Sequence, residues 1–120
     1  SEEARKALSE LRSRGVRITI RSCDVSDPVA LQRVLREINA DLPPLKGIVH
    51  SAMVLDDCAI RNLTPESLDK VMKPKVQGAW NLHQLTLDLE LDFFVRQLFI
   101  FACCQLFFFS TVITVIFIYT

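Results

Sequence analysis

The 120-residue sequence lacks several features that would assign it to a common class of protein. It has no excess of charge, since Lys plus Arg and Asp plus Glu each number 14, and this balance argues against a nucleic-acid partner. Its four cysteines have neither the spacing of a metal site nor that of a secreted disulfide scaffold, so free thiols in a reducing compartment are expected. The cysteines are Cys23, Cys58, Cys103 and Cys104.

The sequence also lacks an internal repeat, a Gly/Ser linker and an amino-terminal apolar signal segment, since it opens on the charged run SEEARKALSELRSRG. We therefore interpret it as part of a longer protein. Its length allows one small domain. Residues 1–95 mix charged and apolar side chains as a globular domain does, whereas residues 96–120 form an apolar tail that has no charge between Gln97 and Tyr119.

The apolar tail has two interpretations. An uncharged helix of about twenty residues spans about 30 Å, which is enough to cross a bilayer, so residues 97–119 could form a transmembrane helix. The alternative is a mistranslated segment, such as a translated intron or a frameshift, and the abrupt change of pattern at Arg96 favours it. In either case we expect residues 97–119 to form one long helix, or the end of a strand followed by a helix.

Helical and strand periodicities alternate along residues 1–95. Asp27 before Pro28 is a typical helix start, and apolar residues follow it at helical spacing. Thr64 before Pro65 marks a second such start. The other expected elements are a first helix that ends at Gly15 and two strands, residues 16–22 and 46–52. The order is therefore helix, strand, helix, strand, helix.

Strands that are joined through helices imply parallel pairing, so the sequence predicts an α/β fold. In such sheets ligands bind beyond the carboxyl ends of the strands. The residues expected there are Cys23–Val25 and His50–Met53. From spacing alone, a turn or capping aspartate is the preferred interpretation of Asp24 over a ligand-binding one, and the same holds for the loop at His50.

The last expected helix has a lysine within its apolar stripe. We expect the stripe to contain Lys75, with Lys70, Lys73 and Gln77 on other faces. The Lys75 side chain could extend to the surface along its aliphatic stem, or it could present a partly desolvated ammonium to a cleft. Periodicity does not choose between the two. The apolar positions of the stripe are Leu68, Val71, Met72, Val76, Ala79 and Leu82.

Four segments, in order and with family-like spacing, resemble the ketoreductase domain of polyketide synthases and animal-type fatty acid synthases, which is a relative of the short-chain dehydrogenases/reductases. The segments are RSCDVSD, LKGIVHSAMVLDD, LTPESLDKVMKPKVQGAWNLHQLT and LDFFV. The resemblance covers residues 2–95 and implies part of a Rossmann-like, doubly wound parallel sheet. It implies an NADPH-dependent parent enzyme that reduces β-ketoacyl thioesters to β-hydroxyacyl thioesters.

The resemblance also implies roles for individual residues around the cofactor. Asp24, with the backbone of Val25, matches the position that receives the adenine amino group of NADPH. His50, Ser51 and Ala52 match the loop beside the ribose and nicotinamide of the cofactor. In this loop Met53 replaces the glycine that is commoner there.

Two further residues match positions that act on the substrate. Lys75 matches the lysine of the catalytic set, which supports the tyrosine that protonates the nascent alkoxide. Asp57 matches the aspartate of the motif found in B-type ketoreductases, which set one hydroxyl configuration. The resemblance implies no metal. It implies other synthase domains and a substrate bound to acyl carrier protein as partners, and a cytoplasmic location unless residues 97–119 are an anchor.

The sequence departs from the family in three ways. It contains no glycine-rich phosphate loop, which in the family lies upstream of the position of Ser1. Leu98 and Phe99 stand where the catalytic serine is expected, and Val112 stands where the tyrosine is expected; Ser110 and Tyr119 have the wrong spacing. We therefore expect the chain to be inactive alone. The alternative is a non-catalytic module, soluble or membrane-attached, that uses the fold for interaction.

Overall fold

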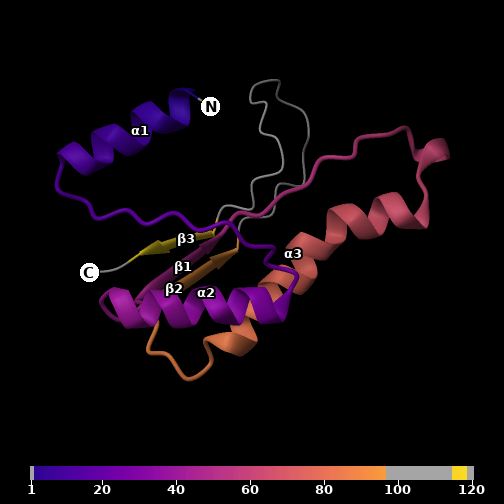
Figure 1. The fold of residues 1–120 in the computed structure, drawn as a ribbon. Coiled ribbons are helices and arrows are strands. Elements are labelled where there is room, and N and C mark those ends of the chain that lie inside the picture. Colours follow the sequence, from indigo (N-terminus) through magenta and orange to yellow (C-terminus); the bar gives the residue numbers. More distant parts are fainter. Residues whose placement is uncertain (1, 97–114, 119–120) are drawn as a thin grey trace.

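A computed structural model describes residues 2–96 and 115–118 of the chain (Figure 1). Within these residues three α-helices, one short 3-10 helix and three strands follow one another along the chain. Their order is α1 (Glu2–Ser13), α2 (Pro28–Asp41), β1 (Gly47–His50), η1 (Ile60–Asn62), α3 (Pro65–Leu85), β2 (Phe93–Arg96) and β3 (Val115–Ile118).

Helix α2 begins where the sequence predicts. The Asp27 carboxylate accepts hydrogen bonds from the backbone N–H groups of Val29 and Ala30, at 2.9 and 3.2 Å, and Pro28 occupies the first turn. These bonds satisfy donors that a helix start leaves without partners. The apolar positions expected on one face are all buried, which confirms this helix in full. They are Leu31, Val34, Leu35 and Ile38.

The three strands form one sheet in the order β2-β1-β3. β1 pairs with β2 in parallel, with Gly47 opposite Phe93, and the chain between them passes through α3. This agrees with the predicted class of parallel strands joined through helices, although the pair is not the expected one, residues 16–22 with 46–52. β3 pairs with β1 antiparallel on the other side. The hydrophobic core lies where α2 and α3 meet the sheet (Figure 1). Its buried residues are Leu31, Leu35, Leu45, Ile48 and Leu82.

The prediction of a strand at residues 16–22 is wrong, because the structure assigns no strand there. A strand exists through hydrogen bonds to a neighbouring strand, and within the described residues these seven lie outside the sheet. The edge of β1 opposite β2 is paired with β3. Val16 and Ile20, the apolar residues at the two ends of the expected alternation, are exposed.

Helix α3 begins at its predicted cap, where the Thr64 hydroxyl accepts a hydrogen bond from the N–H of Ser67 at 3.2 Å. The predicted apolar stripe is only partly correct, since Leu68, Met72 and Val76 are 50%, 44% and 55% exposed. The first half of α3, to which Leu68 and Met72 belong, extends past the sheet (Figure 1). The buried face consists of Pro74, Gly78, Ala79, Asn81 and Leu82.

Helix α1 ends at Ser13, and the predicted closing residue Gly15 follows in the turn with a backbone φ of +83°, which suits glycine. Figure 1 shows α1 apart from the sheet.

The expectation of a helix in the apolar tail is wrong for Val115–Ile118, because these residues form strand β3. The rest of residues 97–119 lies outside the described part of the chain. Among the helices that the structure describes, none is long and apolar enough to span a bilayer.

Candidate functional site

Asp24 lies in a tight turn directly before α2. Its Oδ1 atom accepts two hydrogen bonds from Ser26, one from the backbone N–H at 2.9 Å and one from the hydroxyl at 2.7 Å. The hydroxyl bond is the main reason that the pKa of Asp24 lies below its usual value, and the positive charge of Lys73 contributes further. Asp24 is therefore both a turn residue and a fixed carboxylate, with Oδ2 free of hydrogen bonds from the described residues.

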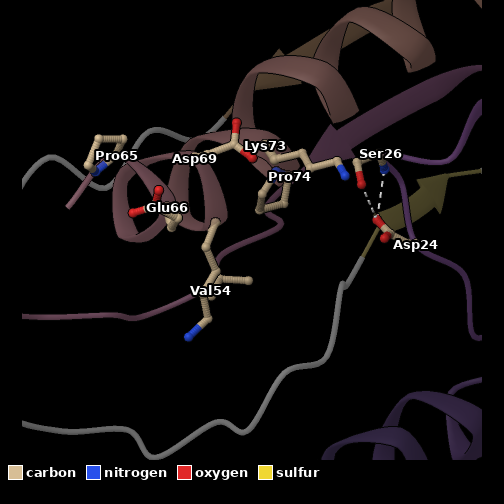
Figure 2. Close-up of a pocket in the computed structure, with 9 residues that line it drawn as sticks. Asp24, Ser26, Val54, Pro65, Glu66, Asp69, Lys73 and Pro74 are labelled. Carbon is tan, nitrogen blue, oxygen red and sulfur yellow. Dashed lines mark hydrogen bonds between the residues drawn. The ribbon is translucent and has the colours of Figure 1, made fainter.

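The Asp24 carboxylate faces a cavity of about 630 Å³ (Figure 2). The cavity lies between the Asp24 turn, the segment that follows β1 and the first half of α3. Its wall combines charges of both signs with apolar surface that includes Val54, Pro65 and Pro74, which suits a ligand that has an apolar ring and hydrogen-bonding groups. The lining residues are Asp24, Ser26, Val54, Pro65, Glu66, Asp69, Lys70, Lys73 and Pro74.

Lys73 belongs to this wall, which sequence reasoning missed by assigning it to an outer face of the helix. Figure 2 shows its side chain extending from α3 toward Ser26 and Asp24. The helical spacing correctly separates Lys73 from the buried face of α3. Helical spacing gives no indication that Lys73 also approaches the Asp24 turn, because that turn lies about fifty residues away in the sequence.

Val25 is held by a short chain of side-chain amides on α3. Asn81 donates from Nδ2 to the Val25 carbonyl oxygen at 3.0 Å, and Gln77 donates from Nε2 to Asn81 Oδ1 at 2.8 Å. Because the Val25 carbonyl oxygen only accepts, the nitrogen of the Asn81 amide must face Val25, which leaves Oδ1 to accept from Gln77. The amide chain therefore sets the distance between α3 and the Asp24 turn.

His50, the last residue of β1, is 2% exposed and contacts α3. Its Nε2 lies 3.1 Å from the carbonyl oxygen of Pro74. A carbonyl oxygen only accepts, so Nε2 carries the proton and donates. The other ring nitrogen, Nδ1, is buried without a partner among the described residues. Burial lowers the pKa of His50, and the bond to Pro74 opposes this in part. The ring is therefore neutral at pH 7 and ties β1 to α3.

Gly78 allows α3 to approach both of these contacts. A Cβ atom at this position would lie 2.5 Å from Cγ2 of Val25 and 3.3 Å from Cε1 of His50. The first distance is shorter than any real contact, so a larger residue would push α3 away. Gly78 thus determines how closely the helix approaches the end of β1 and the Asp24 turn.

The remaining predicted site residues surround this region without lining the cavity. Ala52 is buried, while Ser51, Met53 and Lys75 are half-buried. Lys75 follows Pro74, the residue whose carbonyl holds His50, so its backbone lies beside the end of β1.

Asp57 is exposed in the irregular segment after β1. Its neighbour Asp56 forms an ion pair with Lys70 of α3 at 3.3 Å, which brings this segment to the helix. In the two described stretches, residues 2–96 and 115–118, no group of His, Cys, Asp or Glu could hold a metal ion.

Comparison with known proteins places this geometry in one family. The family model described as KR domain matches residues 1–99. The chain is 43% identical over 95 residues to the phenolphthiocerol synthesis polyketide synthase type I Pks15/1 of Mycobacterium marinum. It is 44% identical over 97 residues to the reducing polyketide synthase PKS1 of Cochliobolus heterostrophus. The matches cover 79% and 81% of this chain and 4% of each synthase.

Solved structures agree with these relatives. A ketoreductase domain from the bacillaene assembly line superimposes with a TM-score of 0.72 at 37% identity, over 78% of this chain and 22% of that one. An A1-type ketoreductase gives a TM-score of 0.67 at 42% identity, over 78% of this chain and 20% of that one. The chain thus spans a small share of the proteins that it matches.

Proposed function

The chain belongs to the KR domain family of polyketide synthases and has its Rossmann-like short-chain dehydrogenase/reductase fold, and from this we propose that it forms the adenine-binding part of an NADPH-dependent ketoreductase. The parent domain would reduce β-ketoacyl thioesters to β-hydroxyacyl thioesters. The chain spans 4% of its curated relatives, so this activity belongs to a larger assembly. Acyl carrier protein, bearing the substrate, and other synthase domains are the proposed partners.

The Asp24 carboxylate is the observation that carries this proposal. Oδ1 is fixed by two bonds to Ser26, which leaves Oδ2 to accept from a ligand in the cavity. The lowered pKa of Asp24 keeps the carboxylate ionised at neutral pH. An ionised acceptor fits the exocyclic amino group of adenine, which can only donate. Val25, held by Asn81, would present its backbone to the same ring.

The residues present therefore fit the adenine end of NADPH. When bound, the cofactor supplies the hydride. His50, Ser51 and Ala52 would lie beside its ribose and nicotinamide, where His50 acts through its bond to Pro74 by holding the end of β1 in place. No glycine-rich loop is present in the sequence to hold the pyrophosphate.

Two residues are proposed to act on the substrate side. The half-buried Lys75 would hold its ammonium near a tyrosine phenol and lower the phenol's pKa, so that the phenol can protonate an alkoxide. The positions expected for the serine and tyrosine, Leu98, Phe99 and Val112, lie outside the described residues. Because none of these three side chains can donate a proton, we propose that the chain has no turnover of its own.

A chimera tests the proposed function. Residues 1–95 would replace the matching segment of the bacillaene ketoreductase domain, whose own continuation supplies the serine and tyrosine. The expected result is NADPH oxidation that depends on a β-keto thioester surrogate. A folded chimera without this activity, beside an active parent domain, would contradict the proposal. The hydroxyl configuration of the product, with and without Asp57→Ala, reports whether Asp57 guides the substrate as B-type enzymes require.

A further inference from the structure

Two lysines of α3 line the cavity, and they differ in their partners. Lys70 forms an ion pair with Asp56 at 3.3 Å. Lys73, three residues later, forms no ion pair with any carboxylate in the described part of the chain, where the three pairs are Arg14–Glu10, Arg21–Glu37 and Lys70–Asp56. Lys70 is therefore engaged in holding the segment after β1, whereas the ammonium of Lys73 is available to a ligand.

Lys73 is directed at the same part of the cavity as Asp24. In Figure 2 its side chain runs along the wall toward Ser26, and Asp24 lies next to Ser26. The two charges are close enough for Lys73 to lower the pKa of Asp24. No ion pair joins them among the described residues. A fixed acceptor and an unpaired donor thus face the cavity from two elements, with a gap between them.

This donor and acceptor match one edge of adenine. On that edge the exocyclic N6 amino group donates hydrogen bonds, and the neighbouring ring atom N7 accepts them. We propose that Lys73 is an adenine-contacting residue whose ammonium donates to N7 while Oδ2 of Asp24 accepts from N6. The proposal rests on the proposed function, because it takes Asp24 as the adenine-binding residue and adds a second contact on the same base.

The pair would also select among purines. Guanine and hypoxanthine carry an oxygen acceptor in place of the N6 amino group, and this oxygen would face the ionised Asp24. Two acceptors in contact repel each other and leave the carboxylate without a donor. Lys73 contributes affinity for any base with N7, whereas Asp24 distinguishes adenine from the other purines.

Saturation-transfer-difference NMR on the complete 120-residue chain tests this with three uncharged probes. Adenosine has both groups, inosine lacks the amino group, and 7-deazaadenosine has a C–H in place of N7. We expect Lys73→Met to weaken adenosine binding about tenfold, which is the effect of losing a hydrogen bond to a charged group. The same substitution should leave 7-deazaadenosine binding unchanged. Lys46→Met is the matched control, because Lys46 lies outside the cavity and donates to the Glu90 carbonyl.

Each outcome separates this proposal from the one on which it rests. Lys73 is exposed, so the variant should fold, and circular dichroism checks that it does. Equal weakening of adenosine and 7-deazaadenosine, or no change for either, would overturn the contact to N7. Inosine binding as tightly as adenosine would instead overturn the role of Asp24. Absence of any adenosine signal would overturn both.

Discussion

Asn81 in α3 donates a hydrogen bond over 3.0 Å to the backbone carbonyl of Val25, a residue 56 positions earlier in the chain. Both residues are buried, and the bond joins the helix to the turn that carries Asp24. Asn81 thus positions Asp24 without itself lining the cavity.

Asn81→Ala should lower the free energy of unfolding by about 1–3 kcal/mol, because it leaves the buried Val25 carbonyl without a donor. Urea denaturation followed by circular dichroism measures this. Gln84→Ala, an exposed position on the same helix, should change it by less than about 0.5 kcal/mol. Equal effects of the two substitutions would show that the bond to Val25 contributes nothing.

Gly78→Ala should also destabilise the chain, although alanine favours helices. The added Cβ would lie 2.5 Å from Val25 Cγ2, and moving the helix to relieve this costs about 1–3 kcal/mol. Thermal unfolding compared with Met72→Ala, at a position 44% exposed on the same helix, isolates the effect. A Gly78→Ala chain more stable than wild type would mean that α3 does not need this close approach.

His50 should make stability depend on pH. Burial lowers its pKa in the folded chain below the ordinary 6.5, so the unfolded chain binds the proton more readily. The contribution of neutral His50 to the free energy of unfolding is complete above pH 6.5 and is lost as the pH falls through the pKa of His50 in the folded chain. His50→Asn should lose this slope below pH 6.5, as measured by urea midpoints. Asp24 titrates below 3.8 and does not overlap this window. If the variant kept the same slope, a group other than His50 would cause the pH dependence of stability.

Lys75 and Lys73 should affect different kinetic constants in the ketoreductase chimera. Lys75→Met should lower kcat by about 10²-fold or more, because the tyrosine loses its support as general acid. Lys73→Met should raise the KM for NADPH and leave kcat nearly unchanged. Steady-state rates at varied NADPH separate the two. A fully active Lys75→Met chimera would place the active site on another face of α3.

The chain alone should bind NADPH weakly. Asp24 and the His50–Ala52 loop offer too few contacts to offset the cost of ordering the cofactor, and the sequence has no glycine-rich loop for its pyrophosphate. Calorimetric titration of the chain should therefore give a dissociation constant well above the micromolar range. Micromolar binding would show that the described residues hold more of the cofactor than Asp24 and its neighbours explain.

The sequence by itself determined the elements whose signals are local. The cap at Asp27, the proline after it and the apolar spacing of α2 lie within one short stretch, so their outcome does not depend on distant residues. The α/β class also followed from the alternating periodicities, although the parallel pair in the structure is β1 with β2 and not the predicted residues 16–22 with 46–52. The family resemblance also came from continuous segments, and it located Asp24 as a candidate for binding the cofactor.

Only the tertiary structure decided which faces and edges are used. Residues 16–22 alternate between apolar and polar side chains as a strand does, yet a strand also needs a pairing partner. Within the described residues, β3 and β2 are the strands that pair with β1. The stripe of α3 was predicted from hydrophobicity alone. The face that is buried is determined by the close approach at Gly78 and by the hydrogen bonds of Asn81 and His50. Lys73 meets the Asp24 turn across the cavity because packing brings together two segments that no local pattern connects.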